Sequence, residues 1–258
     1  MGVTALVRSK IKAGRKRGAF WVRALDVARL VPTAEGRARL WTRFAYSRDV
    51  HQTTPFTCED RYPELFDLAR TMQPGAKRIL SFGCSTGAEL AALRRRFPGA
   101  EILGAEINPR SRRIARRRFW GDSAVALVHP QEVCGEFDLI FALAVLQREP
   151  FKTVESDIRD LSRFYPFERF DAAVTSLAGR LRPGALLCVM HSQYRVEDSA
   201  AAPELEPVEA GPRMEGPFFG RDGRRLSAAT AGSMFRKRGP GGGRGGARLR
   251  SRRASREQ

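Results

Sequence analysis

A strand, a tight turn and a helix follow one another in the stretch RILSFGCSTGAEL at residues 78–90, and this order leaves few possible folds. The apolar residues before Gly83 suit a buried strand, and the Ala, Glu and Leu residues from Ala88 onward favour a helix. The turn Gly83–Gly87 is therefore expected to present free backbone N–H groups at a helix N-terminus. Such groups bind polar or anionic ligands.

Strand-like and helix-like segments keep alternating toward the C-terminus. Predicted strands cover residues 78–82, 100–106, 124–128, 137–143 and 185–190, with later ones near 206–208 and 233–236. Predicted helices cover residues 88–96, 109–119 and 169–181. This alternation implies right-handed crossovers and a parallel sheet covered on both faces. We predict an α/β fold with a doubly wound, mostly parallel, seven-stranded sheet and a helical N-terminal extension.

Composition divides the chain into three parts. Residues 1–75 are predicted to be a basic, mostly helical extension and cap, with one helix at 61–72 just before the first strand. Residues 76–238 are predicted to be the main domain. Residues 239–258 are predicted to be a disordered Gly/Arg-rich tail, because they have too few apolar side chains to offset the entropy lost on ordering.

An insertion at residues 157–170, DIRDLSRFYPFERF, separates the fourth strand from the next helix. We expect this insertion and the N-terminal extension to form a lid over the site. Its aromatic residues are expected either to form an apolar wall of the site or to pack onto the core. They are Phe164, Tyr165, Phe167 and Phe170.

The chain of 258 residues carries a formal net charge of +18. Clustered Lys and Arg residues gain affinity for nucleic acids by displacing counterions from phosphates. Here the charge is mostly Arg in a chain rich in Ala and Gly, and much of it lies at the two ends. We therefore expect only weak, nonspecific nucleic-acid binding.

Neither a metal site nor a disulfide framework is predicted. The cysteines Cys58, Cys84, Cys134 and Cys188 are far apart and show no CxxC or Cys/His ligand spacing. This pattern fits a reducing cytoplasm, and no apolar stretch approaches the ~20 residues needed to cross a bilayer. We predict a cytoplasmic protein without a membrane span.

Two common phosphate-binding motifs fail at specific residues of the turn. A dinucleotide fingerprint needs its second glycine where Ser85 stands, and a P-loop needs Lys where Ala88 follows Gly87. Glu106 lies about twenty residues after the turn, at the end of the second predicted strand, where a carboxylate can accept hydrogen bonds from both hydroxyls of a ribose. A nucleoside without a pyrophosphate fits these residues.

Four segments in this order resemble the class I S-adenosylmethionine-dependent methyltransferases. They are ILSFGCSTGAE, the acidic strand end at Glu106, FDLIFALAVLQ and LAGRLRPGALLCVM, and the resemblance covers residues 61–190. It implies that residues 76–238 form a methyltransferase domain with S-adenosylmethionine as cofactor. The implied reaction is an in-line transfer of a methyl group to a small-molecule or protein acceptor.

The turn GCSTGAE also resembles that of the chemotaxis-receptor methyltransferases. By that resemblance Glu89 faces the methionine ammonium, although it could instead be a first-turn carboxylate that interacts with the helix dipole. Arg61 could pair with the cofactor carboxylate, or it could equally well pair with Glu64 or Asp67. The predicted cofactor-binding residues are Gly83, Cys84, Ser85, Gly87, Glu89, Glu106, Ile107, Ala142 and Arg61.

The sequence constrains catalytic residues less. Candidates lie after the fourth and fifth strands and in the segment before the domain: His51, Gln147, Arg148 and His191. A general base is needed only when the acceptor must lose a proton. No Asn-Pro-Pro-aromatic motif of the kind expected of amino-methylating DNA enzymes follows the fourth strand. The alternative function is a basic nucleic-acid-binding protein, or an RNA methyltransferase, on the same scaffold.

Overall fold

The computed structural model describes residues 30–47, 49–52, 57–227 and 229–239. The predicted Gly/Arg-rich tail, apart from its first residue, and the most basic part of the N-terminal extension lie outside the described residues. Within the described ranges, no helix is long and apolar enough to cross a bilayer.

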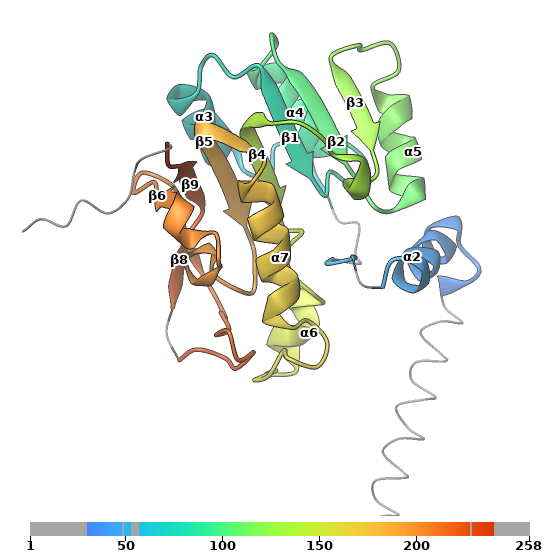
Figure 1. Cartoon of the computed structure of the whole chain (residues 1–258). Helices are drawn as coiled ribbons and strands as arrows, with labels where there is room; N and C mark the ends of the chain where they lie inside the picture. The colour runs from blue at the N-terminus through green and yellow to red at the C-terminus, as the bar shows by residue number, and fades with distance from the viewer. Residues whose placement is uncertain (1–29, 48, 53–56, 228, 240–258) are drawn as a thin grey trace, which may run out of the picture.

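A seven-stranded sheet forms the centre of the structure (Figure 1). In spatial order, its strands are β3 (Val125–Val128), β2 (Glu101–Ala105), β1 (Arg78–Phe82), β4 (Phe137–Leu143), β5 (Leu181–Met190), β9 (Met234–Lys237) and β6 (Leu205–Pro207). Neighbours from β3 to β5 pair in parallel, and β9 is antiparallel to both β5 and β6. The predicted mostly parallel, seven-stranded sheet is confirmed.

Helices cover both faces of this sheet. On one face lie α3 (Pro63–Met72), α4 (Ala88–Arg96) and α5 (Pro109–Arg118), and on the other lies α7 (Phe167–Ala178). Two further helices lie toward the carboxyl ends of the strands in Figure 1: α2 (Ala34–Ala45) and α6 (Pro150–Glu155). A small antiparallel hairpin of β7 (Arg213–Glu215) and β8 (Thr230–Gly232) completes the described elements, with 3₁₀ turns at Pro130–Glu132, Val196–Asp198 and Ala202–Glu204.

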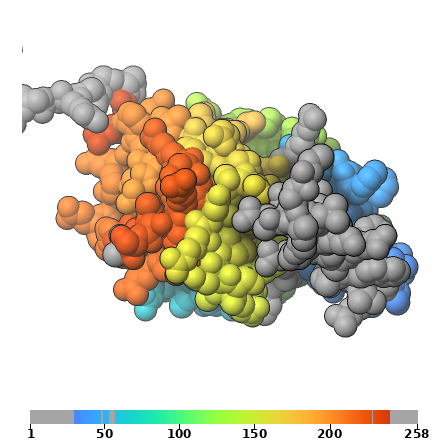
Figure 2. All heavy atoms as spheres, turned by 90° about the horizontal axis from the view of Figure 1, so that it is seen from below, coloured from blue at the N-terminus to red at the C-terminus, as the bar shows by residue number. Residues whose placement is uncertain are grey.

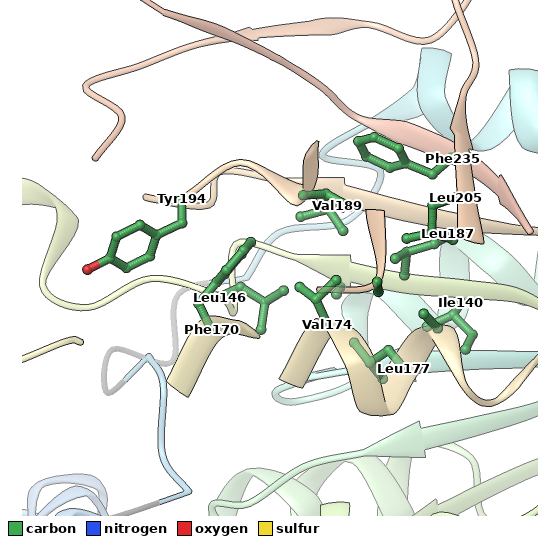
Figure 3. Close-up of a cluster of buried hydrophobic side chains, with 14 of the residues drawn as sticks. Ile140, Leu146, Phe170, Val174, Leu177, Leu187, Val189, Tyr194, Leu205 and Phe235 are labelled. Atoms are coloured by element: carbon green, nitrogen blue, oxygen red, sulfur yellow. The ribbon is translucent and has the colours of Figure 1, made fainter. Parts of the chain in front are cut away.

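Alternation along the strands divides the core between the two faces. On β1, Leu80 belongs to the cluster on the α7 side, whereas Ile79 belongs to the cluster on the α4 side. Figure 3 shows the α7 side, where residues of β4, β5, β9 and the helix meet. Of the insertion's aromatic residues, Tyr165, Phe167 and Phe170 are buried in this cluster and Phe164 packs against it. These rings therefore stabilise the core, the second of the two predicted fates.

The largest boundary error lies between α7 and β5. The predicted helix continued to residue 181, but α7 ends at Ala178 and β5 already begins at Leu181. Pro183 and Gly184 therefore belong to the strand. The register against β4 shifts near Phe137, and the φ of +79° at Gly184 lets the irregular strand accommodate the proline.

Several short elements were missed by the sequence prediction. The described residues between α2 and α3 form no helix. The six residues of α6 and the three-residue strands β7 and β8 are too short for a hydrophobic period to reveal them.

Asp138, at the start of β4, holds the start of the neighbouring strand β1 by hydrogen bonds. Its Oδ2 accepts hydrogen bonds from the backbone N–H groups of Lys77 (2.8 Å) and Arg78 (2.9 Å), and its Oδ1 accepts one from Arg182 Nη1 (2.8 Å). These hydrogen bonds outweigh the partial burial of the carboxyl and lower the pKa of Asp138. The carboxylate thus joins β1, β4 and β5 at the N-terminal ends of these parallel strands.

We expect Asp138→Ala to lower the free energy of unfolding by about 2–4 kcal/mol at pH 7, because two backbone donors lose a charged acceptor. Since the folded-state pKa of Asp138 is depressed, this stabilisation is present above the unfolded pKa and is lost as the pH falls through the folded pKa. Urea denaturation at pH 7 and at acid pH measures it. The control is Glu136→Ala, an exposed residue one position from β4; equal losses for the two variants at pH 7 would contradict the assignment.

Candidate functional site

Two adjoining pockets open where β1, β2 and β4 end, at the point where the chain order reverses across the sheet. This is where open α/β sheets bind ligands. The Glu106 pocket has a volume of about 760 Å³, and the Glu89 pocket has a volume of about 370 Å³. They share Gly83, Ser85 and Leu143, so one elongated ligand can extend through both.

The turn between β1 and α4 forms the common floor of the two pockets. Its backbone has left-handed φ angles at Gly83 (+83°), Ser85 (+50°) and Gly87 (+88°). The N–H of Gly83 donates to the carbonyl of Ala105 at the end of β2 (2.8 Å), which fixes the turn against the neighbouring strand. A side chain at Gly83 would lie 2.5 Å from Val145 Cγ2, so close packing as well as φ requires glycine.

Glu106 connects this turn to the loop after β2. Its Oε2 accepts from the N–H of Ser85 (2.8 Å), and its Oε1 accepts from the N–H of Asn108 (2.7 Å). Burial raises the pKa of Glu106, while these two hydrogen bonds and Arg112 act in the opposite direction. The side chain of Asn108 caps α5 by accepting from the N–H groups of Arg110 and Ser111.

Ser85 presents a polar atom without a partner to the Glu106 pocket. The residue is 8% exposed, and its hydroxyl makes no hydrogen bond with the described residues. Buried hydroxyl groups normally have hydrogen-bond partners. The unsatisfied hydroxyl, beside a carboxylate with two occupied lone-pair sites, indicates a polar ligand at this position.

Glu89 and Arg61 place a carboxyl group and a guanidinium around the Glu89 pocket. Ser81, on β1, donates its hydroxyl to Glu89 Oε1 at 2.7 Å. Burial raises the pKa of Glu89 to about 8, although the Ser81 hydrogen bond and the charge of Arg61 lower it. Tyr62 also lines this pocket, and its hydroxyl is buried without a partner among the described residues. A carboxyl group and a guanidinium in one small pocket suit a zwitterionic amino-acid group.

The N-terminal extension closes the Glu106 pocket from the side opposite the sheet. Arg39 and Thr42 of α2 line it, together with Asp49, His51 and Gln52 of the following segment. Of these, the sequence prediction named His51 alone. No motif marks the others, because they reach the site through the packing of an extension onto the ends of β1 and β2.

Of three further predicted cofactor-binding residues, two line a pocket and one does not. Ile107 lines the Glu106 pocket as expected. Cys84 lines the Glu89 pocket, but its thiol is buried in the core and burial raises its pKa well above the ordinary value. Ala142 is fully buried in the core, and the pocket wall is formed instead by the three residues after it, from Leu143 to Val145. Ala142 lies one residue before the end of β4 and points into a packed face of the sheet, whereas the turn after β4 is open.

The four catalytic candidates separate into two groups. His51 Nδ1 and the hydroxyl of Tyr165 are 2.8 Å apart. Burial, with the nearby charges of Arg169 and Arg148, lowers the pKa of His51 to about 4, so its ring is neutral at pH 7. Arg148 donates to the backbone carbonyls of Val50 (3.0 Å) and His51 (3.1 Å) and so fastens the capping segment to the end of β4.

Gln147 and His191 lie instead in a third pocket, the His191 pocket, with a volume of about 560 Å³. Gln147 donates its amide to the carbonyl of Ala144 (3.0 Å). The ring of His191 lies against that of Tyr62, with centroids 5.6 Å apart, and burial with the charge of Arg61 lowers the pKa of His191. The structure thus brings Gln147 and His191 together at a pocket other than that of His51.

No family model matches the chain. Over 106 residues it is 35% identical to the trans-aconitate 2-methyltransferase of Methylobacterium nodulans, which covers 40% of this chain and 40% of that protein. Over 159 residues it is 28% identical to the protein of the same name from Variovorax paradoxus, covering 57% of this chain and 54% of that protein. The chain thus spans about half the length of the curated relatives it matches.

A solved structure with a similar arrangement is the N-methyltransferase NodS from Bradyrhizobium japonicum in complex with S-adenosyl-L-homocysteine. Its TM-score is 0.44 at 18% identity, over 69% of this chain and 88% of NodS. In the chain described here, the seventh strand of the sheet is antiparallel and lies between the fifth and sixth. The chain has the class I methyltransferase fold. The Glu106 and Glu89 pockets lie next to the end of its first strand.

Because Gly83 combines a positive φ with close packing, we expect Gly83→Ala to destabilise the protein more than Gly121→Ala. Gly121 has a similar φ of +88°, but a Cβ added there would meet no other atom within 4 Å, so this variant isolates the cost of the backbone conformation. That cost is about 1–2 kcal/mol. The clash at Gly83 should add at least about 1 kcal/mol in urea denaturation; equal losses would show that Val145 moves aside freely.

Proposed function

We propose that the protein is an S-adenosylmethionine-dependent methyltransferase that acts on a small-molecule acceptor. The observation that carries this proposal is the junction of the Glu106 and Glu89 pockets at the turn Gly83–Gly87. One pocket offers the carboxylate of Glu106, and the other offers Glu89 with Arg61. These are the groups that a nucleoside joined to an amino acid requires.

Glu106 is suited to hold a ribose because its carboxylate keeps acceptor capacity after its internal hydrogen bonds. An ionised carboxylate has about four lone-pair sites. The N–H groups of Ser85 and Asn108 use two of them, one on each oxygen. The remaining site on each oxygen would accept one ribose hydroxyl, and the Ser85 hydroxyl supplies a further polar contact.

The Glu89 pocket is suited to the methionine end of the cofactor. In this proposal Glu89 accepts from the ammonium group and Arg61 attracts the carboxylate. The cofactor supplies an electrophilic methyl group bonded to a sulfonium. The part of the chain is then to hold both ends so that the methyl group points toward an acceptor, because in-line displacement depends chiefly on alignment.

The nucleic-acid alternative is less well supported by the positions of the arginines on α5. Arg112 donates to the carbonyl of Glu106, Arg116 donates to the carbonyl of Leu127 at 2.9 Å, and Arg118 pairs with Glu59. These three side chains bind groups of the protein itself, so they do not form a row of cations directed at phosphates. Weak nonspecific binding and a cytoplasmic location stay predictions.

We expect Glu106→Ala to weaken the binding of S-adenosylmethionine at least about tenfold, because each lost charge-assisted hydrogen bond contributes about 1.5–3 kcal/mol. Isothermal titration calorimetry measures the affinity, and thermal unfolding checks that the variant is folded. Glu101→Ala, at the exposed start of β2, is the matched control and should bind like the parent. A folded Glu106→Ala variant with undiminished affinity would place the ribose elsewhere.

The raised pKa of Glu89 predicts that cofactor binding depends on pH. In the free protein the carboxyl is mostly protonated below pH 8, and an ammonium partner favours its ionised form. Binding therefore releases a proton, and affinity should rise as the pH is raised from about 6 to about 8. Calorimetry in buffers of different ionisation enthalpy measures the proton release.

Glu89→Gln should remove this proton release and lower the affinity at pH 8. Glu64→Gln, an exposed change in the first turn of α3, should preserve both. If Glu89→Gln releases the same number of protons as the parent, the ammonium group does not lie beside Glu89.

A further inference from the structure

We infer that the His191 pocket receives the methyl acceptor, and that this acceptor is a molecule without anionic groups, with an apolar body and one hydroxyl or amine group. The inference rests on the proposed function. It assigns the pocket that the cofactor groups leave unused, and it names the class of substrate that the pocket fits.

The pocket lies where β4 and β5 end, between α6 and the β7–β8 hairpin. Pro150, Thr153 and Val154 line it from α6, and Met214 and Phe218 line it from the hairpin region. Figure 2 shows these two segments, yellow and orange-red, side by side on the face toward which the strands point. Helix α6 and the β7–β8 hairpin thus enclose a space next to the predicted cofactor region.

His191 connects this space to the Glu89 pocket. Its ring lines the His191 pocket on one side and lies against Tyr62, a residue of the Glu89 pocket, on the other. The charge of Arg61 reaches the same imidazole. A molecule in the His191 pocket therefore lies next to the region that would hold the methionine end of the cofactor.

The lining of the pocket selects against anionic acceptors. Among the described residues that line it, none is Arg or Lys, and Glu215 adds a negative charge. Its buried polar side chains are already paired: Gln193 with Thr153 (2.9 Å) and with the backbone of Arg148, and Ser192 with the carbonyl of Tyr194 (2.7 Å). Apolar side chains provide the remaining contact surface, so a carboxylate placed here would lose its hydration without a partner.

His191 is the side chain positioned to receive a proton from the acceptor. It is exposed toward the pocket and adopts a left-handed φ of +52°, a conformation that is uncommon for non-glycine residues. Burial and the charge of Arg61 lower its pKa, which favours the neutral ring that a base requires. In the reaction, the acceptor oxygen or nitrogen forms a bond to the methyl carbon while the sulfur–methyl bond breaks. The electron pair of the broken sulfur–methyl bond stays on sulfur, and the proton of the acceptor group passes to the imidazole of His191.

The competing location is the capped side of the Glu106 pocket, beside His51. There the imidazole of His51 is hydrogen-bonded to the hydroxyl of Tyr165. The positive charges of Arg148 and Arg169 lie near the same ring. That environment fits an anionic acceptor. The two locations therefore predict acceptors of opposite character, which an experiment can separate.

The test uses 2-naphthol, a neutral apolar molecule with one hydroxyl, as the probe of the full-length protein saturated with S-adenosyl-L-homocysteine. Its fluorescence should report saturable binding that Val154→Asp weakens at least about tenfold, because a charge replaces an apolar contact. The matched control is Phe151→Asp on the same helix. Phe151 is exposed, as Val154 is, but it lies outside the pocket lining, so this variant should bind like the parent.

The imidazole resonances decide which pocket the probe occupies. The chain has three histidines, so His191→Asn identifies the resonance of His191. 2-Naphthol should shift that resonance, and naphthalene, which lacks the hydroxyl, should shift it less. Absence of saturable 2-naphthol binding, equal losses in the two α6 variants, a shift at His51 instead, or displacement of the probe by trans-aconitate would overturn the inference. Absence of S-adenosyl-L-homocysteine binding would instead refute the proposed function, and it is measured separately by calorimetry.

Discussion

The hydrogen bonds of the buried Glu106 carboxylate hold the site together. By accepting from Ser85 and Asn108, it joins the turn after β1 to the loop after β2, two segments that are distant in sequence. A buried carboxylate is costly unless backbone donors offset its desolvation. Here those donors belong to the turns that form the pocket, so the same interactions that stabilise the carboxylate also fix the shape of the site.

Around this centre the structure separates three tasks. The sheet ends and the turn Gly83–Gly87 form the floor, the N-terminal extension covers the Glu106 pocket, and α6 with the β7–β8 hairpin encloses the His191 pocket. Arg112 and Arg116 of α5 contribute by donating to backbone carbonyls of the loop after β2 and of β3. Together with Arg118, three of the six arginines of α5 thus make contacts within the protein.

The sequence predicted those parts whose structure is determined locally. The mostly apolar segments of β1 and β4 and the helix-forming residues of α4 specified these three elements to the residue, and the acidic end of β2 identified Glu106. It failed where structure depends on distant packing. Nothing in Arg39 or Thr42 indicates that α2 lies over the sheet ends, and Ala142 was assigned to the pocket because a strand pattern does not show where the strand stops and its open turn begins.

The two histidine candidates show how equal sequence signals diverge once the chain is folded. Each is a lone histidine near a strand end or loop, and sequence alone gave no reason to prefer either. Folding pairs His51 with Tyr165 in a buried, positively charged setting, where gaining a proton is unfavourable. It places His191 at an exposed, strained turn between two pockets. A base needs access to the acceptor, so the exposure of its ring toward a pocket, rather than the identity of the side chain, favours His191 over the buried His51.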